Sequence, residues 1–126
     1  MAQLDKSLSG WLENALRQLH TATIGKVESY DQSRRRATVQ PLIMQKVMGK
    51  PPTPHAVMTD VPVMFQRFEV DGVEKEYIPI LKTGDVVLLV CSERAMDQSL
   101  NGAMAFPDSR RRHSLTDAVV VGVITS

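Results

Sequence analysis

The sequence predicts a mainly β protein, a small Greek-key barrel of five to six short strands that follows an N-terminal amphipathic α-helix. Apolar residues recur every three or four positions in the first 22 residues, which is helical spacing. Short apolar segments separated by turn residues fill most of the remainder, and a continuous apolar run lies at 118–124. We therefore expect two parts, a helix over residues 1–22 and a barrel domain over residues 23–126.

Composition limits the classes of protein that fit. With 126 residues, 43% of them hydrophobic and 23% charged, the chain resembles one soluble globular domain. The formal net charge of +1 argues against a surface that is basic all round. Cys91 is the only cysteine, so we expect a buried thiol and no intrachain disulfide. No apolar run is long enough to span a bilayer, and no signal peptide is evident, so we expect folding in a reducing cytoplasm.

The predicted helix has one apolar stripe. At about 1.5 Å per residue it would be roughly 30 Å long. Two interpretations stay open: the stripe packs on the chain's own barrel, or it docks onto a partner chain. Its tryptophan suits the second. The stripe residues are Leu4, Leu8, Trp11, Leu12, Leu16 and Leu19.

The predicted strands are bounded by turn residues. An aspartate opens the turn at 31–34, an Asp-Gly pair marks a hairpin or protruding loop within 66–76, and Gly84 suits a turn with positive φ. The run at 118–124 is apolar at nearly every position, so we expect a strand buried on both faces. Residues 93–101 are expected to be a short helix or turn. The expected strands cover 24–30, 37–40, 57–65, 77–80, 86–91 and 118–124. Their hairpin order suggests an OB-fold-like barrel.

No group of residues predicts catalysis. His113 and Asp117 lie four positions apart, but no nucleophile elbow accompanies them, and we expect loop residues with capping roles. The three histidines lack metal-ligand spacing, and no glycine-rich phosphate loop is present. We expect a protein that is not an enzyme, with no metal, no cofactor and no small-molecule substrate.

Two arginine clusters, 34–36 and 110–112, have two interpretations. An OB-fold that binds single-stranded nucleic acid would use them along the backbone, but it also needs stacking aromatics, and these are only 5% of the chain. The favoured interpretation is an ion-pairing interface with another subunit. The predicted subunit-interface residues are Arg34, Arg35, Arg36, Arg110, Arg111, Arg112, Val121 and Val123.

The order of several motifs resembles a known family. The motifs are LHTATIGKV at 19–27, SYD at 29–31, RATVQPLI at 36–43, VPVMF at 61–65, GDVVLLV at 84–90, SERAMD at 92–97 and DSRRRHSLTDA at 108–118. In this order they resemble the start of tailed-bacteriophage baseplate central spike proteins, which begin with an OB-fold domain. The resemblance covers about residues 15–124.

The resemblance implies a structural virion protein of the tail baseplate, made in the host bacterial cytoplasm. Its role would be that of a homotrimeric OB-fold collar that links the tail hub protein to the central spike or tip used in host envelope penetration and genome delivery. The sequence has no β-helical needle and no His-x-His tip, so we expect a separate tip protein, a blunt spike, or a fragment, and an adaptor role. The helix stripe would dock onto the hub, and the arginines would pair with acidic residues 69–76 of a neighbouring protomer. Single-stranded nucleic-acid binding is the alternative.

Overall fold

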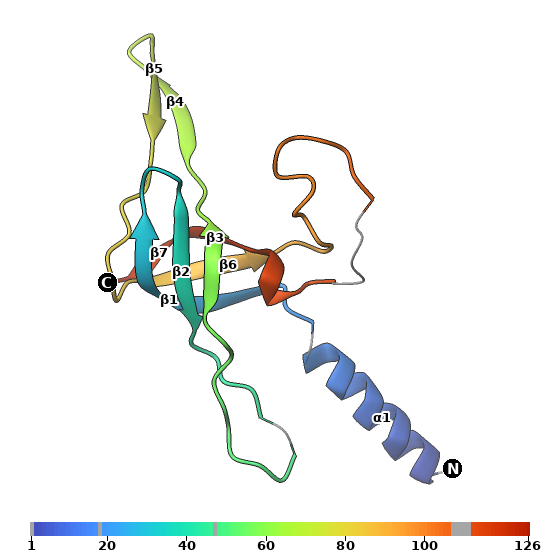
Figure 1. The fold of residues 1–126 in the computed structure, drawn as a ribbon. Helices are drawn as coiled ribbons and strands as arrows, with labels where there is room; N and C mark the ends of the chain where they lie inside the picture. The colour runs from blue at the N-terminus through green and yellow to red at the C-terminus, as the bar shows by residue number, and fades with distance from the viewer. Residues whose placement is uncertain (1, 18, 47, 107–111) are drawn as a thin grey trace. The chain divides into compact units, whose positions relative to one another are not determined.

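The structure is a computed structural model that describes residues 2–17, 19–46, 48–106 and 112–126, with the side chains of the helix described from Asp5 to Leu16. It is mainly β, with one N-terminal helix and seven strands in two antiparallel sheets among the described residues (Figure 1). The elements are α1 (Ala2–Arg17), β1 (Ala22–Asp31), β2 (Arg36–Pro41), β3 (Met58–Pro62), β4 (Gln66–Val70), β5 (Val73–Tyr77), β6 (Val86–Cys91), a short 3-10 helix (Leu115–Asp117) and β7 (Ala118–Thr125).

The chain forms two compact units. One, the sheet unit, comprises Ala22–Val90 and Ala118–Ser126, and the other, the helix–loop unit, comprises Met1–Thr21 and Cys91–Asp117. Within the helix–loop unit, the backbone N–H of His20 donates to the carbonyl oxygen of His113 at 2.8 Å. The N–H of Cys91 likewise donates to the carbonyl oxygen of Thr21 at 3.0 Å. These bonds tie the segment after α1 to both ends of the 91–117 loop.

Strand β1 is the centre of a five-stranded sheet with the order β3-β2-β1-β6-β7. It pairs antiparallel with β2 on one side and with β6 on the other. Alternate residues face the core, as expected for strands with one buried face. The fully buried apolar side chains in this sheet are Val27, Val39, Val87, Leu89 and Val120.

The two edges of this sheet approach each other. Just beyond β3, Val63 forms a parallel bridge with Val120 of β7, and the N–H of Met64 donates to the carbonyl oxygen of Val120 at 3.0 Å. Strands β3 and β7 are the first and last in the sheet order, so this contact can form only if the sheet curls strongly.

Gly25 makes part of that curl possible. It lies in β1 opposite Pro41 of β2 and Val87 of β6. A Cβ atom at this position would collide with Val39 Cγ1 and would lie 3.0 Å from Leu89 Cδ1. Side chains of both flanking strands therefore fill the space that a larger residue in β1 would need.

Several sequence predictions need correction. The helix ends at Arg17 and not at residue 22, because the last turn closes with the N–H of Leu19 donating to the carbonyl oxygen of Leu16 and β1 begins at Ala22. The structure has seven strands where five to six were expected, since the 66–77 segment forms its own two-stranded sheet, β4–β5. By contrast, one alternative expected for residues 93–101, a turn, is confirmed, because these residues form bends and turns.

The prediction that 118–124 is buried on both faces was also wrong. Ala118 and Val120 are buried, but Val121, Val123 and Ile124 are 42%, 46% and 52% exposed. Apolar composition alone did not distinguish a strand covered on both faces from one whose second half has an exposed apolar surface.

Replacing Gly25 with alanine should lower the free energy of unfolding by about 1–3 kcal/mol, because the added methyl group overpacks the space filled by Val39 and Leu89. Chemical denaturation followed by circular dichroism measures the change. Gly122→Ala is the matched control, since this glycine also lies in a strand and nothing lies within 4 Å of a Cβ at its position. Equal stability of Gly25→Ala and the wild type would contradict the close approach described for β1.

Candidate interaction surfaces

The β1–β2 turn is built on Asp31. Its Oδ1 atom accepts hydrogen bonds from the N–H and the hydroxyl of Ser33, at 3.1 and 2.7 Å, and from the N–H of Arg34 at 3.3 Å. The Ser33 hydroxyl bond, followed by the Arg34 backbone bond, holds the pKa of the Asp31 carboxyl below its usual value. This bonding confirms the predicted turn and presents three successive arginines at its end.

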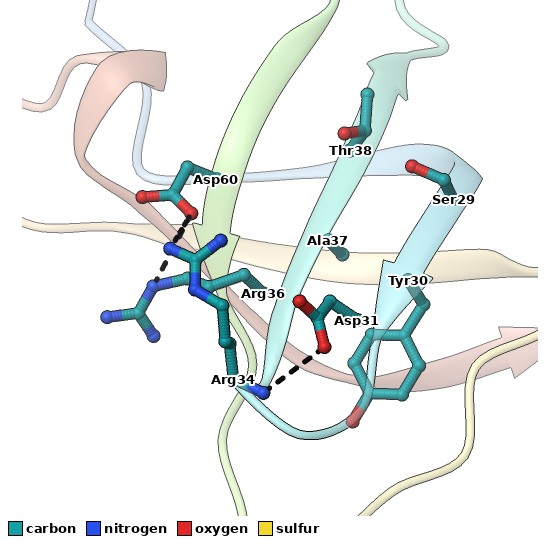
Figure 2. Close-up of a pocket in the computed structure, with 8 residues that line it drawn as sticks. All are labelled: Ser29, Tyr30, Asp31, Arg34, Arg36, Ala37, Thr38 and Asp60. Atoms are coloured by element: carbon teal, nitrogen blue, oxygen red, sulfur yellow. Dashed lines mark hydrogen bonds and ion pairs between the residues drawn. The ribbon is translucent and has the colours of Figure 1, made fainter.

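Asp60 binds two of these arginines. Arg34 Nη2 lies 2.9 Å from Asp60 Oδ1, and Arg36 Nε lies 3.9 Å from the same oxygen (Figure 2). Asp60 has a φ of 56°, a left-handed conformation that aspartate tolerates better than most residues. It lies in β3, where the pairing with β2 shifts register between Ala37 and Val39. The irregularity in β3 thus sets the carboxylate against the turn.

Arg35 contacts the β4–β5 hairpin and the segment before it. Its guanidinium carbon lies 4.2 Å from the centre of the Phe65 ring, and Arg35 Nη1 lies 3.7 Å from Glu76 Oε1. Arg67 also lies over Phe65, at 5.4 Å. A cation over an aromatic ring contributes about 0.5–1 kcal/mol when exposed to solvent. These contacts join the β1–β2 turn to the base of the hairpin.

A shallow, open pocket lies at this turn (Figure 2). Two arginines and two aspartates stand around it, so their charges balance and the pocket is not a strong site for either anions or cations. The lining residues are Ser29, Tyr30, Asp31, Arg34, Arg36, Ala37, Thr38 and Asp60.

The arginines predicted to face another subunit therefore have partners within the chain. Arg34 and Arg36 share Asp60, and Arg35 pairs with Glu76, a residue of the acidic segment that was expected to be contributed by a neighbour. Pairing across a subunit interface stays a prediction. In the second cluster, Arg112 is exposed, and Arg110 and Arg111 lie outside the described residues.

The predicted docking stripe of α1 is exposed to solvent. Leu8, Leu12, Leu16 and Leu19 are 44–57% exposed and Trp11 is 70% exposed, while the side chain of Leu4 lies outside the described residues. The predicted interface residues Val121 and Val123 are also exposed, on β7. These surfaces carry apolar side chains that water solvates poorly.

Asp117 organises the loop of the helix–loop unit. It is fully buried, its Oδ1 accepts from the N–H of Met96 at 3.4 Å, and its carbonyl oxygen accepts from the N–H of Ser92 at 2.9 Å. Burial, followed by the nearby Asp117 charge, raises the pKa of the buried Cys91 thiol. Asp117 thus caps loop N–H groups, and Cys91 is the buried thiol that the sequence predicts.

Sequence reasoning missed two connections. The first is the Asp60 carboxylate, whose only sequence signal is a polar residue within an apolar strand pattern. The second is Tyr30, whose hydroxyl donates to the carbonyl oxygen of Pro79 at 2.7 Å. These partners lie 49 residues apart, so no local pattern could have paired them.

Metal sites and membrane-spanning helices would indicate two other classes of function. In the part of the chain that the structure describes, no cluster of three or more His, Cys, Asp or Glu side chains is positioned to bind a metal ion. None of the helices described is both long enough and apolar enough to cross a membrane.

The fold and these surfaces define a mainly β domain with an amphipathic helix and exposed apolar surfaces. The chain belongs to the family described as phage protein Gp138 N-terminal domain, whose model matches residues 24–122. No curated protein matches the chain significantly. The family match supports the expectation of a phage structural protein and covers most of both sheets.

Tyr30→Phe should lower the free energy of unfolding by about 0.5–1.5 kcal/mol near neutral pH, because the bond to Pro79 is lost. Burial raises the pKa of Tyr30 above its ordinary value of 10.0, with Asp31 adding to the rise and Arg35 opposing it. The neutral hydroxyl is therefore favoured in the folded state. Its contribution is full below about pH 10 and is lost as the pH rises through the folded pKa.

Urea unfolding between pH 7 and 11 measures both the stability lost in Tyr30→Phe and the pH dependence of that loss. Tyr77→Phe, on the exposed hairpin, is the control. The stability difference between wild type and Tyr30→Phe should narrow above pH 10. A constant difference over this range, or none at pH 7, would contradict the assigned bond.

Proposed function

We propose that this chain is a trimeric OB-fold collar in the baseplate of a phage tail, where it links the tail hub to a central spike or tip used in envelope penetration and genome delivery. The observation that carries the proposal is the order β3-β2-β1-β6-β7 together with the parallel Val63–Val120 bridge between its edges. A five-stranded, partly open Greek-key barrel is the architecture of an OB-fold. The phage family match supports the setting.

The hub-facing element in this proposal is α1. Its apolar stripe leaves Trp11 70% exposed. An amphipathic helix that lays its apolar face in a groove is a common mode of protein recognition. We therefore assign the docking role to the stripe and a non-enzymatic, structural role to the chain as a whole.

The trimer contacts are assigned to the sheet unit. The second half of β7 exposes Val121 and Val123 on a strand at the edge of the sheet order. A long apolar edge strand invites pairing with another chain, and a subunit contact would cover it. A spike tip protein completes the proposed set of partners, as the resemblance to baseplate spikes implies.

Nucleic-acid binding has no comparable support. The residues that would track a phosphate backbone, Arg34 to Arg36, are bonded to the carboxylates of Asp60 and Glu76. A binding site for single strands also needs stacking aromatics beside its cations. Phe65 lies under Arg35, and the cation covers the face that a base would need.

Trp11→Glu and Leu12→Glu should each reduce incorporation of the chain into assembled phage tails by tenfold or more, because a carboxylate would be buried at the proposed hub contact. Quantitative mass spectrometry of purified particles, carrying each variant in place of the wild type, measures incorporation. Lys6→Glu is the matched control, since it places the same carboxylate elsewhere on α1.

The docking assignment requires that Lys6→Glu particles retain wild-type levels of the chain. Thermal unfolding of each purified variant checks that the sheets remain folded. Normal incorporation of both stripe variants would refute the docking role of α1, and equal loss in all three would show that the stripe itself is not the determinant.

A further inference from the structure

The β4–β5 hairpin has two chemically different faces. Phe68, Val73 and Tyr77 lie on one face together with Lys75, which is paired with Phe68, and the rings of Phe68 and Tyr77 meet edge to face at 5.6 Å. The side chains of Phe68, Val73 and Tyr77 are at least half exposed. A two-stranded hairpin is marginally stable alone, so covering this aromatic face would stabilise it.

The opposite face of the hairpin is acidic. Glu69 and Glu74 are directly paired across the two strands, and no ion pair to either is present among the described residues. Like charges opposite each other destabilise a strand pair. Over residues 66–77 there are four acidic and two basic side chains, so the hairpin has a formal net charge of −2. It therefore suits a partner that wraps around an edge of the ribbon, with apolar groups against one face and basic groups against the other.

The loop between β2 and β3, residues 42–57, has this character. Its sequence contains Lys46 and Lys50 and no acidic residue. Ile43, Met44 and Met48 are 57%, 58% and 89% exposed. The two arms of the loop are held together by paired hydrogen bonds between Gln45 and Thr53, at 2.8 and 2.9 Å, so the surface is partly organised.

The hairpin and the loop cannot meet within one chain. The loop enters β3 and the hairpin follows it, and Figure 1 shows them at opposite ends of the five-stranded sheet. The apolar side chains of both surfaces remain exposed in the single chain. An acidic apolar surface at one end and a basic apolar surface at the other are complementary between copies.

We propose that the β4–β5 hairpin of one copy binds the β2–β3 loop of a second copy, in a head-to-tail contact. The apolar loop residues cover the aromatic face of the hairpin, and Lys46 and Lys50 reach around the edge of the ribbon to neutralise Glu69 and Glu74 on the opposite face. Neighbouring strands are only about 4.8 Å apart, so a long lysine side chain reaches past the edge of such a narrow ribbon. A head-to-tail contact closes into a ring or extends as a filament.

This contact deepens the proposed function, since in a closed ring of three it joins the protomers of the collar. The Arg35–Glu76 pair and the Arg35–Phe65 contact hold the base of the hairpin in one orientation, which reduces the entropy lost on binding.

A charge-reversal cycle tests the contact on the full chain. The hairpin variant combines Glu69→Lys with Glu74→Lys, the loop variant combines Lys46→Glu with Lys50→Glu, and a third protein carries all four changes. Sedimentation velocity measures association over a concentration series. Each two-residue variant should associate at least tenfold more weakly than the wild type, and the four-residue variant should recover most of the loss.

A control variant that combines Lys26→Glu with Lys82→Glu, two exposed reversals outside both surfaces, has the same net charge as the loop variant and should leave association unchanged. Mixing the hairpin variant with the loop variant adds a second readout. In the mixture, the basic hairpin of the first variant can bind the acidic loop of the second, and the wild-type hairpin of the second can bind the wild-type loop of the first. Hetero-association in that mixture supports a contact between copies, which a merely structural role of these residues would not produce.

The possible outcomes distinguish a failure of the head-to-tail contact from a failure of the proposed collar. A trimer that persists in both two-residue variants overturns the head-to-tail contact and leaves the collar standing. A filament or dimer that the reversals dissociate and the four-residue variant restores supports the contact and overturns the closed trimer. A monomeric wild type overturns both.

Discussion

The sharp curl of the sheet around β1 is the constraint on which the rest of the sheet unit depends. Gly25 makes part of it possible by leaving room for Val39 and Leu89 from the two flanking strands. The curl brings the sheet edges together at the Val63–Val120 bridge. Without that approach β3 and β7 would each be an open edge, and the buried valines would lose one side of their packing.

The β1–β2 turn then orients the β4–β5 hairpin, which extends from the five-stranded sheet. Asp31 shapes the turn, Asp60 binds two of its arginines, and Arg35 extends to Phe65 and Glu76 at the base of the hairpin. Exposed ion pairs contribute little stability individually. These contacts instead orient the hairpin. The β1–β2 turn holds its base, while the side chains of β4 and β5 themselves are almost all exposed.

Local chemistry predicted most of the sheet unit. The turns at Asp31 and Gly84 and the apolar strands could be read directly, since each depends on neighbouring residues. The burial of β7 could not be predicted in this way, because an apolar strand sequence looks the same whether the strand packs in the core or exposes its side chains to a partner. The arginine partners were also missed: Asp60 lies 26 residues from Arg34, and only the folded register brings them together. The different chemistry of the two hairpin faces could not be predicted either, because the net charge of residues 66–77 does not show which side chains share a face.

A cryo-electron microscopy reconstruction of an assembled phage tail that contains this chain is the decisive test of a three-copy collar between hub and tip. A collar of this kind should appear as three copies of the five-stranded sheet around the tail axis, with each α1 inserted into the hub. Any other copy number, or density for α1 directed away from the hub, would contradict it.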